Sequence, residues 1–111
     1  MAPDERVVAF TVIELRRRAA KPAGYSEFLR RDSFSCGIYE LPAGATDPQY
    51  THREDELYVV LRGRATLSVG DSVLPVARCS IMFVAAGVPH RFVDIEDHLT
   101  VLVLFAPPET S

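Results

Sequence analysis

The sequence predicts an all-β fold, either a sandwich or a barrel, with one short helix near its N-terminal end. Two observations lead to this prediction. From residue 25 onward the chain is a succession of short apolar segments of strand length, separated by glycine, proline and acidic residues that favour turns. Before them, a T-x-x-E pattern begins at Thr11, and such a pattern commonly marks the start of a helix.

The predicted helix begins with Thr11 and Glu14, which form a capping box behind an apolar residue. Basic residues in its last turns complement the helix dipole, and a Pro-Ala-Gly sequence at 22–24 ends it. No aromatic residues are interleaved with the arginine run, so it is interpreted as a solvated helix face rather than an anion or nucleic-acid patch. Residues 1–24 are therefore predicted to form an N-terminal extension with a short helix, and residues 25–111 the β-domain. The basic residues are Arg16, Arg17, Arg18 and Lys21.

Eight strands are expected after the helix. Gly70-Asp71 is predicted to form a hairpin turn, and Glu96-Asp97 a turn between the last two strands. Cys36 is interpreted as a small buried hydrophobic residue of the core. The expected strands span residues 25–31, 33–41, 57–61, 64–69, 72–76, 81–84, 89–95 and 99–105.

Length and composition favour one domain and exclude several classes of protein. A chain of 111 residues can bury a core without disulfide bonds, and 48% hydrophobic residues against 24% charged ones exclude disorder. A net charge of -3 gives no electrostatic footprint for nucleic acid. No segment approaches the roughly 18 apolar residues that cross a membrane, and the first residues lack the profile of a secretory signal. Two cysteines, Cys36 and Cys79, are too few for a disulfide framework and indicate a cytoplasmic protein.

Two of the predicted strands, residues 57–61 and 99–105, are apolar on both faces. A sheet with one wet face alternates apolar and polar residues, so the outer face of these strands needs a cover. Either the second sheet of a sandwich or a second copy of the chain would provide it. A standard interface removes about 800 Å² from each partner, which at ~25 cal/mol per Å² of apolar surface is a large driving force. A homodimer is therefore expected.

Two stretches of the chain combine residues that bind metals. In the first, Tyr50 and His52 are two residues apart, so in an extended chain their side chains point to the same face. An acidic run ending in Glu56 follows. In the second, His90 comes after an Ala-Gly turn, at the start of an apolar strand. Two histidines and a carboxylate from distant strands are the minimum first shell of many mononuclear metal sites.

The two stretches resemble the two motifs of the cupins. The first cupin motif, G-x5-H-x-H-x3-E-x6-G, matches with every spacing intact except that Tyr50 takes the place of the first histidine. The second, G-x5-P-x-G-x2-H-x3-N, has its second glycine and its histidine, whereas Cys79, Ala85 and Asp94 replace its first glycine, its proline and its asparagine. The matching residues are Gly44, His52, Glu56 and Gly63 in the first motif and Gly87 and His90 in the second.

This resemblance implies a double-stranded β-helix, the RmlC-like jelly-roll barrel of the cupins. It also implies a divalent transition metal, which could be Fe, Mn, Ni, Cu or Zn, held by His52, Glu56 and His90. Tyr50 is the candidate catalytic residue: as a phenolate it would be a further ligand, and as a phenol it would donate a hydrogen bond or a proton to a bound molecule. Glu54 would share the face of His52 in an extended chain and is the alternative to Glu56, although an acidic run at a strand junction is usually a solvated turn.

Three functions follow from the resemblance. The first is a metal-dependent enzyme, a dioxygenase or an isomerase, acting on a small molecule in the barrel. The second is a module that binds or senses a small molecule without turnover, and the third is a metal-free structural cupin. The motif histidines and Glu56 speak against the third, because a lost site has no chemical reason to keep such a cluster. Phosphosugar chemistry is disfavoured because Lys21 is the only lysine in the chain.

Three more residues near the second stretch have predicted positions. Phe92 and Asp94 share the face of His90 in an extended strand, so Phe92 is expected to wall the pocket. Asp94 is expected either to orient a ligand or to hold a turn. His98 lies outside both motifs and is interpreted as a surface or strand-end residue.

Overall fold

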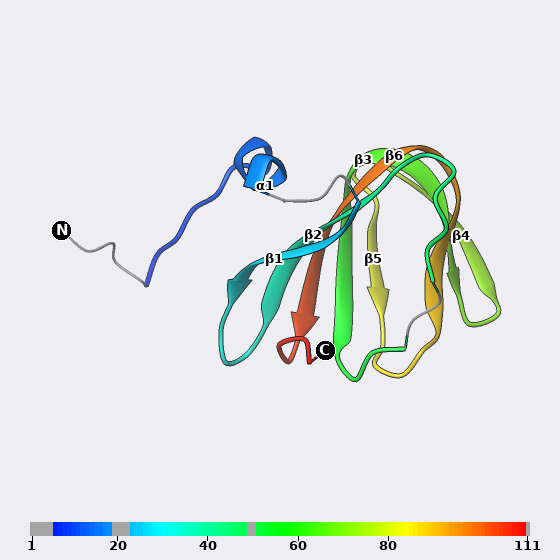
Figure 1. The fold of residues 1–111 in the computed structure, drawn as a ribbon. Helices are drawn as coiled ribbons and strands as arrows, with labels where there is room; N and C mark the ends of the chain where they lie inside the picture. Colours follow the sequence, from blue (N-terminus) through cyan, green and yellow to red (C-terminus); the bar gives the residue numbers. More distant parts are fainter. Residues whose placement is uncertain (1–5, 19–22, 49–50, 111) are drawn as a thin grey trace.

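The computed structural model describes residues 6–18, 23–48 and 51–110, which form one antiparallel sheet that curls on itself, preceded by a short helix (Figure 1). The strand order is β1-β2-β6-β3-β4, and β5 pairs with β3 on the side. The predicted all-β fold with one N-terminal helix is confirmed. The elements are α1 (Val12–Arg18), β1 (Gly24–Arg30), β2 (Ser35–Leu41), β3 (Asp55–Val69), β4 (Ser72–Ala77), β5 (Ile81–Val84) and β6 (His90–Ala106).

The helix α1 begins at the predicted capping box, where the Glu14 N–H donates to Thr11 Oγ1 at 3.1 Å. Its one buried side chain is Leu15. Arg16 is only partly solvated, because its Nε lies 3.2 Å from Oε2 of the buried Glu40 on β2. The rest of the arginine run is exposed, as predicted. Lys21 and Pro22 lie outside the described residues, and no helix in the described ranges is long and apolar enough to cross a membrane.

The two longest strands correct the predicted pattern. The segments 57–61 and 64–69 are joined in β3, and the segments 89–95 and 99–105 are joined in β6, so Glu96-Asp97 is not a turn. The pairing of β3 with β6 shifts register three times between Val60 and Thr66. Such bulges bend a strand without ending it. Gly63 lies at the bend with φ of +94°, and a glycine inside an apolar run resembles a strand end in the sequence.

The shorter strands agree closely with the prediction. β5 has the predicted bounds, and the Gly70 hairpin joins β3 to β4, with Val69 paired to Ser72. β2 begins two residues later than expected, at Ser35, while β1 and β4 differ by one residue at their ends. Cys36 is buried, as predicted. These agreements reflect turn residues that mark the ends of short strands clearly.

The hydrophobic core lies between the two walls of the curled sheet. β3 and β6 arch from one wall to the other, so both contribute residues at each end of the barrel (Figure 1). Their alternating burial directs every second side chain inward. Each fully buried aliphatic or aromatic side chain stabilises the fold by about 1.5–3 kcal/mol. The most deeply buried apolar residues are Ile38, Val60, Leu67, Val84, Phe92, Leu99, Val101 and Val103.

Cys79, which replaces the first glycine of the second motif, keeps the backbone conformation of a glycine. Its φ is +75°, in the left-handed region that costs L-residues about 1–2 kcal/mol. The turn is held in place because the Cys79 N–H donates to the Val60 carbonyl at 2.8 Å and the Val60 N–H donates to Ser80 O at 2.9 Å. The chain therefore retains the glycine conformation at this position without the glycine.

Cys79→Gly is expected to stabilise the protein by about 0.5–1 kcal/mol, because relief of the left-handed conformation exceeds the added entropy of the unfolded chain. Urea unfolding followed by circular dichroism measures the change. Cys79→Ala is the matched control, since it removes the thiol and keeps the Cβ, and it should give no gain. If both variants gain the same free energy of unfolding, the gain comes from removal of the thiol and not from the backbone conformation.

Candidate metal centre and its cavity

His52, Glu56 and His90 come together inside the barrel. His52 Nε2 lies 3.2 Å from Glu56 Oε1, and His90 Nε2 lies 3.2 Å from Glu56 Oε2. One ligand atom from each residue lies within 4.8 Å of the others. In the sheet, His90 pairs with Val69, thirteen residues from Glu56 along β3. The contact between His90 and Glu56 therefore depends on the curling of the sheet, which brings the two ends of β3 face to face.

The Glu56 carboxylate is 1% exposed. Among the described residues, none makes a well-formed hydrogen bond to Glu56 Oε1, Glu56 Oε2 or His90 Nε2. Burial of an unpaired carboxylate costs several kcal/mol unless a positive charge offsets it. Two imidazole nitrogens and a carboxylate are the donors that Fe, Mn, Ni, Cu and Zn accept. These residues therefore fit a divalent transition metal.

The ring of His90 is fixed by a backbone contact. Its Nδ1 lies 2.8 Å from the Val88 carbonyl, so Nδ1–H donates and Nε2 faces Glu56, with a lone pair there when the imidazole is neutral. Burial opposes the charged form of His90, but the Glu56 carboxylate and the Val88 carbonyl outweigh it and raise the pKa of the imidazole. A histidine oriented in this way by its second nitrogen is typical of metal ligands.

The other residues of the acidic run lie outside the cluster. Glu54 is buried rather than solvated, contrary to expectation, and its Oε2 accepts a hydrogen bond from Thr110 Oγ1 at 3.0 Å. Asp55 is exposed and accepts the Ala86 N–H at 2.9 Å, which ties the two motif stretches together. Glu56 alone of the three contacts the histidines. Tyr50, the candidate catalytic residue, lies outside the described residues.

The predictions for the residues after His90 were wrong in part. Phe92 is 1% exposed and belongs to the core, where its ring packs 5.3 Å from that of Tyr58, so it does not wall the cavity. Asp94 is exposed and has φ of +49°, which breaks the alternation that would have aimed it inward. His98 lies within β6 rather than at its end, and its Nε2 is 3.5 Å from Glu40 Oε1.

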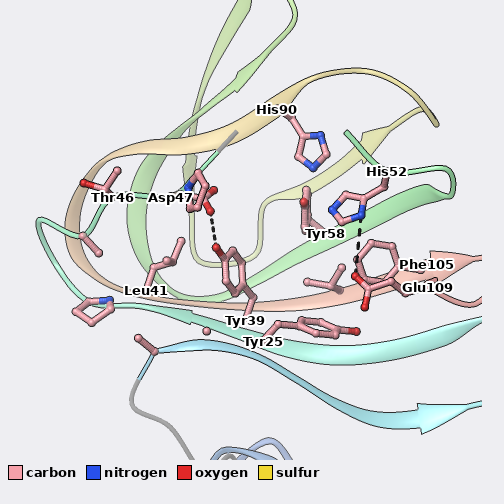
Figure 2. Close-up of a pocket in the computed structure, with 16 residues that line it drawn as sticks. Tyr25, Tyr39, Leu41, Thr46, Asp47, His52, Tyr58, His90, Phe105 and Glu109 are labelled. Atoms are coloured by element: carbon pink, nitrogen blue, oxygen red, sulfur yellow. Dashed lines mark hydrogen bonds and ion pairs between the residues drawn. The ribbon is translucent and has the colours of Figure 1, made fainter. Parts of the chain in front are cut away.

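A cavity of about 550 Å³ opens beside the three-residue cluster. His52 and His90 are part of its wall, and Figure 2 shows their rings above the aromatic residues of the opposite side. A volume of this size accommodates a small organic molecule. The lining residues are Ala23, Gly24, Tyr25, Tyr39, Leu41, Pro42, Ala45, Thr46, Asp47, Pro48, His52, Tyr58, His90, Val103, Phe105 and Glu109.

Sequence reasoning missed the polar groups that line this cavity. Tyr58 is two residues after Glu56 on β3, and burial and the Glu56 carboxylate raise the pKa of its phenol far above the ordinary value, so it stays protonated and can donate a hydrogen bond. Asp47 accepts hydrogen bonds from the Tyr39 hydroxyl and, at 2.7 Å, from the Phe92 N–H. Burial raises the pKa of Asp47, and these two hydrogen bonds oppose the rise. The strand period of two could have identified Tyr58, whereas Asp47 lies in a loop without such a signal.

The C-terminal segment brings Glu109 to the cavity. The Glu109 N–H donates to Ser35 Oγ at 3.0 Å, and its carbonyl accepts from Arg30 Nη2 at 2.7 Å. Its carboxylate lies 4.0 Å from His52 Nδ1 (Figure 2). Burial raises the pKa of this carboxyl, His52 lowers it, and nearby carboxylates, Glu54 first, raise it. No sequence pattern indicated this residue, because it follows the last strand.

Comparisons with known proteins agree with this geometry. The sequence model of the cupin domain matches residues 37–106. An uncharacterized protein from Streptomyces coelicolor is 48% identical over 103 residues, covering 92% of this chain and 98% of that protein. An RmlC-like cupin family protein with a double-stranded β-helix fold from Methanocaldococcus jannaschii has a TM-score of 0.75 at 21% identity, over 96% of this chain and 94% of that one. A Bacillus halodurans protein has a TM-score of 0.77 at 18% identity, over 99% and 89%. The predicted double-stranded β-helix is thereby confirmed.

Proposed function

This chain belongs to the cupin family, and on that premise we propose that it is a metal-binding single-domain cupin whose cavity takes a small molecule. His52, Glu56 and His90 are the proposed ligands of a divalent transition metal, either Fe, Mn, Ni, Cu or Zn. The observation that carries the proposal is the Glu56 carboxylate, which is 1% exposed, makes no well-formed hydrogen bond with the described residues and has an imidazole nitrogen 3.2 Å from each oxygen.

The residues around the cluster fit both binding and catalysis. When bound, the metal would act as a Lewis acid on an oxygen of the small molecule. Tyr58, next to the cluster, is a neutral phenol that can donate a hydrogen bond to such an oxygen. Asp47 fixes the Tyr39 hydroxyl, so one polar group of the wall is already oriented before a ligand arrives.

We propose enzymatic activity of the dioxygenase or isomerase type as the first use of this site. Tyr58 supports this use, because its phenol lies on the cavity wall beside the cluster, where it can donate a hydrogen bond to an oxygen on which negative charge develops. Tyr50 remains a candidate for the same role. A binding or sensing module is the second use, in which the same cavity holds a ligand without changing it. We also propose a cytoplasmic location, which fits the unpaired Cys36 and Cys79.

Elemental analysis by inductively coupled plasma mass spectrometry tests the proposal on untagged protein. The parent is expected to contain about one transition-metal ion per chain, and the triple variant His52→Ala, Glu56→Ala, His90→Ala none. His98→Ala is the matched control, since it removes a histidine outside the cluster and should leave the metal content unchanged. A parent without metal, even after reconstitution with each candidate ion, would overturn the proposal.

We further propose that the chain forms a homodimer through an apolar patch on the outer face of the sheet. In β5, β3 and β6, directly paired residues share a face, and two rows of apolar side chains lie side by side there. Phe83 is 62% exposed and Ile81 is 68% exposed, so the β5 part of the patch is uncovered within one chain. A second copy would bury it. The patch consists of Phe83, Leu57 and Leu104 in one row and Ile81, Val59 and Leu102 in the other.

Phe83→Asp is expected to convert the dimer to a monomer, because a charge at the centre of an apolar interface leaves a buried carboxylate unpaired. The dissociation constant of the dimer, measured by sedimentation equilibrium, should rise by about a hundredfold or more. Val73→Asp on β4 is the matched control, since Val73 is 68% exposed and lies outside the patch. A dimer that survives Phe83→Asp, or a parent that is monomeric at millimolar concentration, would contradict this interface.

A further inference from the structure

The cavity wall is acidic. Of the described residues that line it, none is a lysine or an arginine, whereas Asp47 and Glu109 contribute carboxylates. Asp47 is already engaged, because both of its oxygens accept hydrogen bonds from Tyr39 and Phe92. The nearest ion-pair partner of the Glu109 carboxylate in the described chain is His52 Nδ1, at 4.0 Å. Of the two acidic groups of the wall, Glu109 is thus the one whose carboxylate can bind a further cationic group.

Tyr25 faces the same end of the cavity as Glu109. Its hydroxyl is buried and, within the ranges that the structure describes, has no hydrogen-bond partner. The Glu109 carboxylate is the charged group with the largest influence on this phenol. Gly37 makes room for the ring, since a Cβ at that position would overlap it. A buried hydroxyl without a partner is costly, which indicates that a ligand group completes its hydrogen bonding.

Aromatic rings enclose this end of the cavity. The centroid of the Tyr25 ring lies 5.7 Å from that of Phe105, edge to face, and the His52 ring lies 5.1 Å from Phe105 (Figure 2). Aromatic faces attract cations through their quadrupole, and a carboxylate beside them adds a full opposite charge. The combination of a carboxylate, a phenol without a partner and aromatic rings matches the chemistry that binds an ammonium group.

We propose that Glu109, Tyr25 and Phe105 form a subsite for the ammonium group of the ligand, so that the natural ligand is a small organic amine. The ammonium N–H groups would donate to the Glu109 carboxylate and the Tyr25 hydroxyl oxygen. His52 borders both this subsite and the metal cluster, so one small molecule reaches both. The proposal that the molecule also contacts a metal rests on the proposed function, whereas the preference for an amine does not.

Three probes of similar size and different charge test the subsite: 2-phenylethylamine, 2-phenylethanol and phenylacetate. Their dissociation constants are measured by NMR chemical-shift titration at neutral pH on both metal-loaded and chelator-treated protein. In both forms the amine is expected to bind at least about fivefold more tightly than the alcohol. In the chelator-treated form phenylacetate is expected to bind most weakly. Equal binding of amine and alcohol in both forms would overturn the subsite.

Glu109→Gln is expected to remove the preference for the amine while the alcohol binds as before. Glu96→Gln is the matched control, because Glu96 is an exposed carboxylate outside this cavity and its substitution should change nothing. Metal content, measured on the same samples, separates the two proposals. Parent protein that takes up no metal even after reconstitution, yet prefers the amine, would refute the metal centre alone, and metal-loaded protein without the preference would refute the subsite alone.

Discussion

Glu56→Gln is expected to lower stability when metal is present and to leave it equal or higher when metal is absent. With metal at a hundredfold excess over its dissociation constant, binding to the folded parent alone adds about 2.7 kcal/mol, a shift in Tm on the order of 10 °C, and the variant loses this gain. Without metal, the same substitution removes a carboxylate that is 1% exposed and lacks good hydrogen bonds. While both imidazoles are neutral, this removes the cost of burying an unpaired charge, so the free energy of unfolding should not fall.

Differential scanning fluorimetry with added metal and with chelator measures both effects. Glu54→Gln is the matched control, since Glu54 is a second buried glutamate that lies outside the cluster and is bound by Thr110. Its effect on Tm should be the same in both conditions. A Glu56→Gln variant whose Tm falls equally with and without metal would show that Glu56 serves the fold rather than a metal.

Gly63→Ala is expected to destabilise the protein by about 3–5 kcal/mol, a large share of the free energy of unfolding of a small domain. Gly63 has φ of +94°, and a Cβ there would collide with the His98 carbonyl oxygen and lie 2.9 Å from Leu99 Cα. Both are backbone atoms of β6, which cannot move without breaking the sheet. Urea unfolding, or the soluble fraction on expression if the variant does not fold, measures the loss.

Gly70→Ala separates the two causes of this loss. Gly70 also has a positive φ, of +55°, but a Cβ there would meet no atom within 4 Å. Gly70→Ala should therefore lower the free energy of unfolding by only about 1–2 kcal/mol, the cost of placing an L-residue in the left-handed conformation. If both variants lose the same free energy of unfolding, the close approach of β3 and β6 at Gly63 does not contribute to the loss.

Most of the fold could be predicted from the sequence because turn residues mark the ends of short strands. Turn residues such as Gly70 and the alternation of apolar residues located β2, β4 and β5 to within two residues. The long strands were divided in the prediction because a bulge glycine such as Gly63 and an acidic pair such as Glu96-Asp97 also mark turns. Local sequence does not distinguish a bent strand from two strands, since the difference depends on the pairing with a distant partner.

The residues of the candidate site could be predicted where they belong to a sequence motif, but not where they lie outside one. His52, Glu56 and His90 were named from motif spacing, and the structure places them within contact distance. The burial of Glu54 and the outward position of Asp94 were not foreseen, because each depends on tertiary contacts or on one left-handed residue. Glu109 reaches the cavity through hydrogen bonds to β1 and β2, which no spacing along the chain encodes.

The course of β3 and β6 through the whole barrel has a consequence for how the molecule opens. β2 pairs with β6, and β4 and β5 pair with β3, so these two strands cannot separate at one end while the rest stays folded. Their amide protons are therefore expected to exchange with solvent only through global unfolding, whereas those of the outer strands β1 and β4 exchange by local fraying. Any ligand that binds at the His52 end would slow exchange at the opposite end by the same factor, because both ends share one opening free energy.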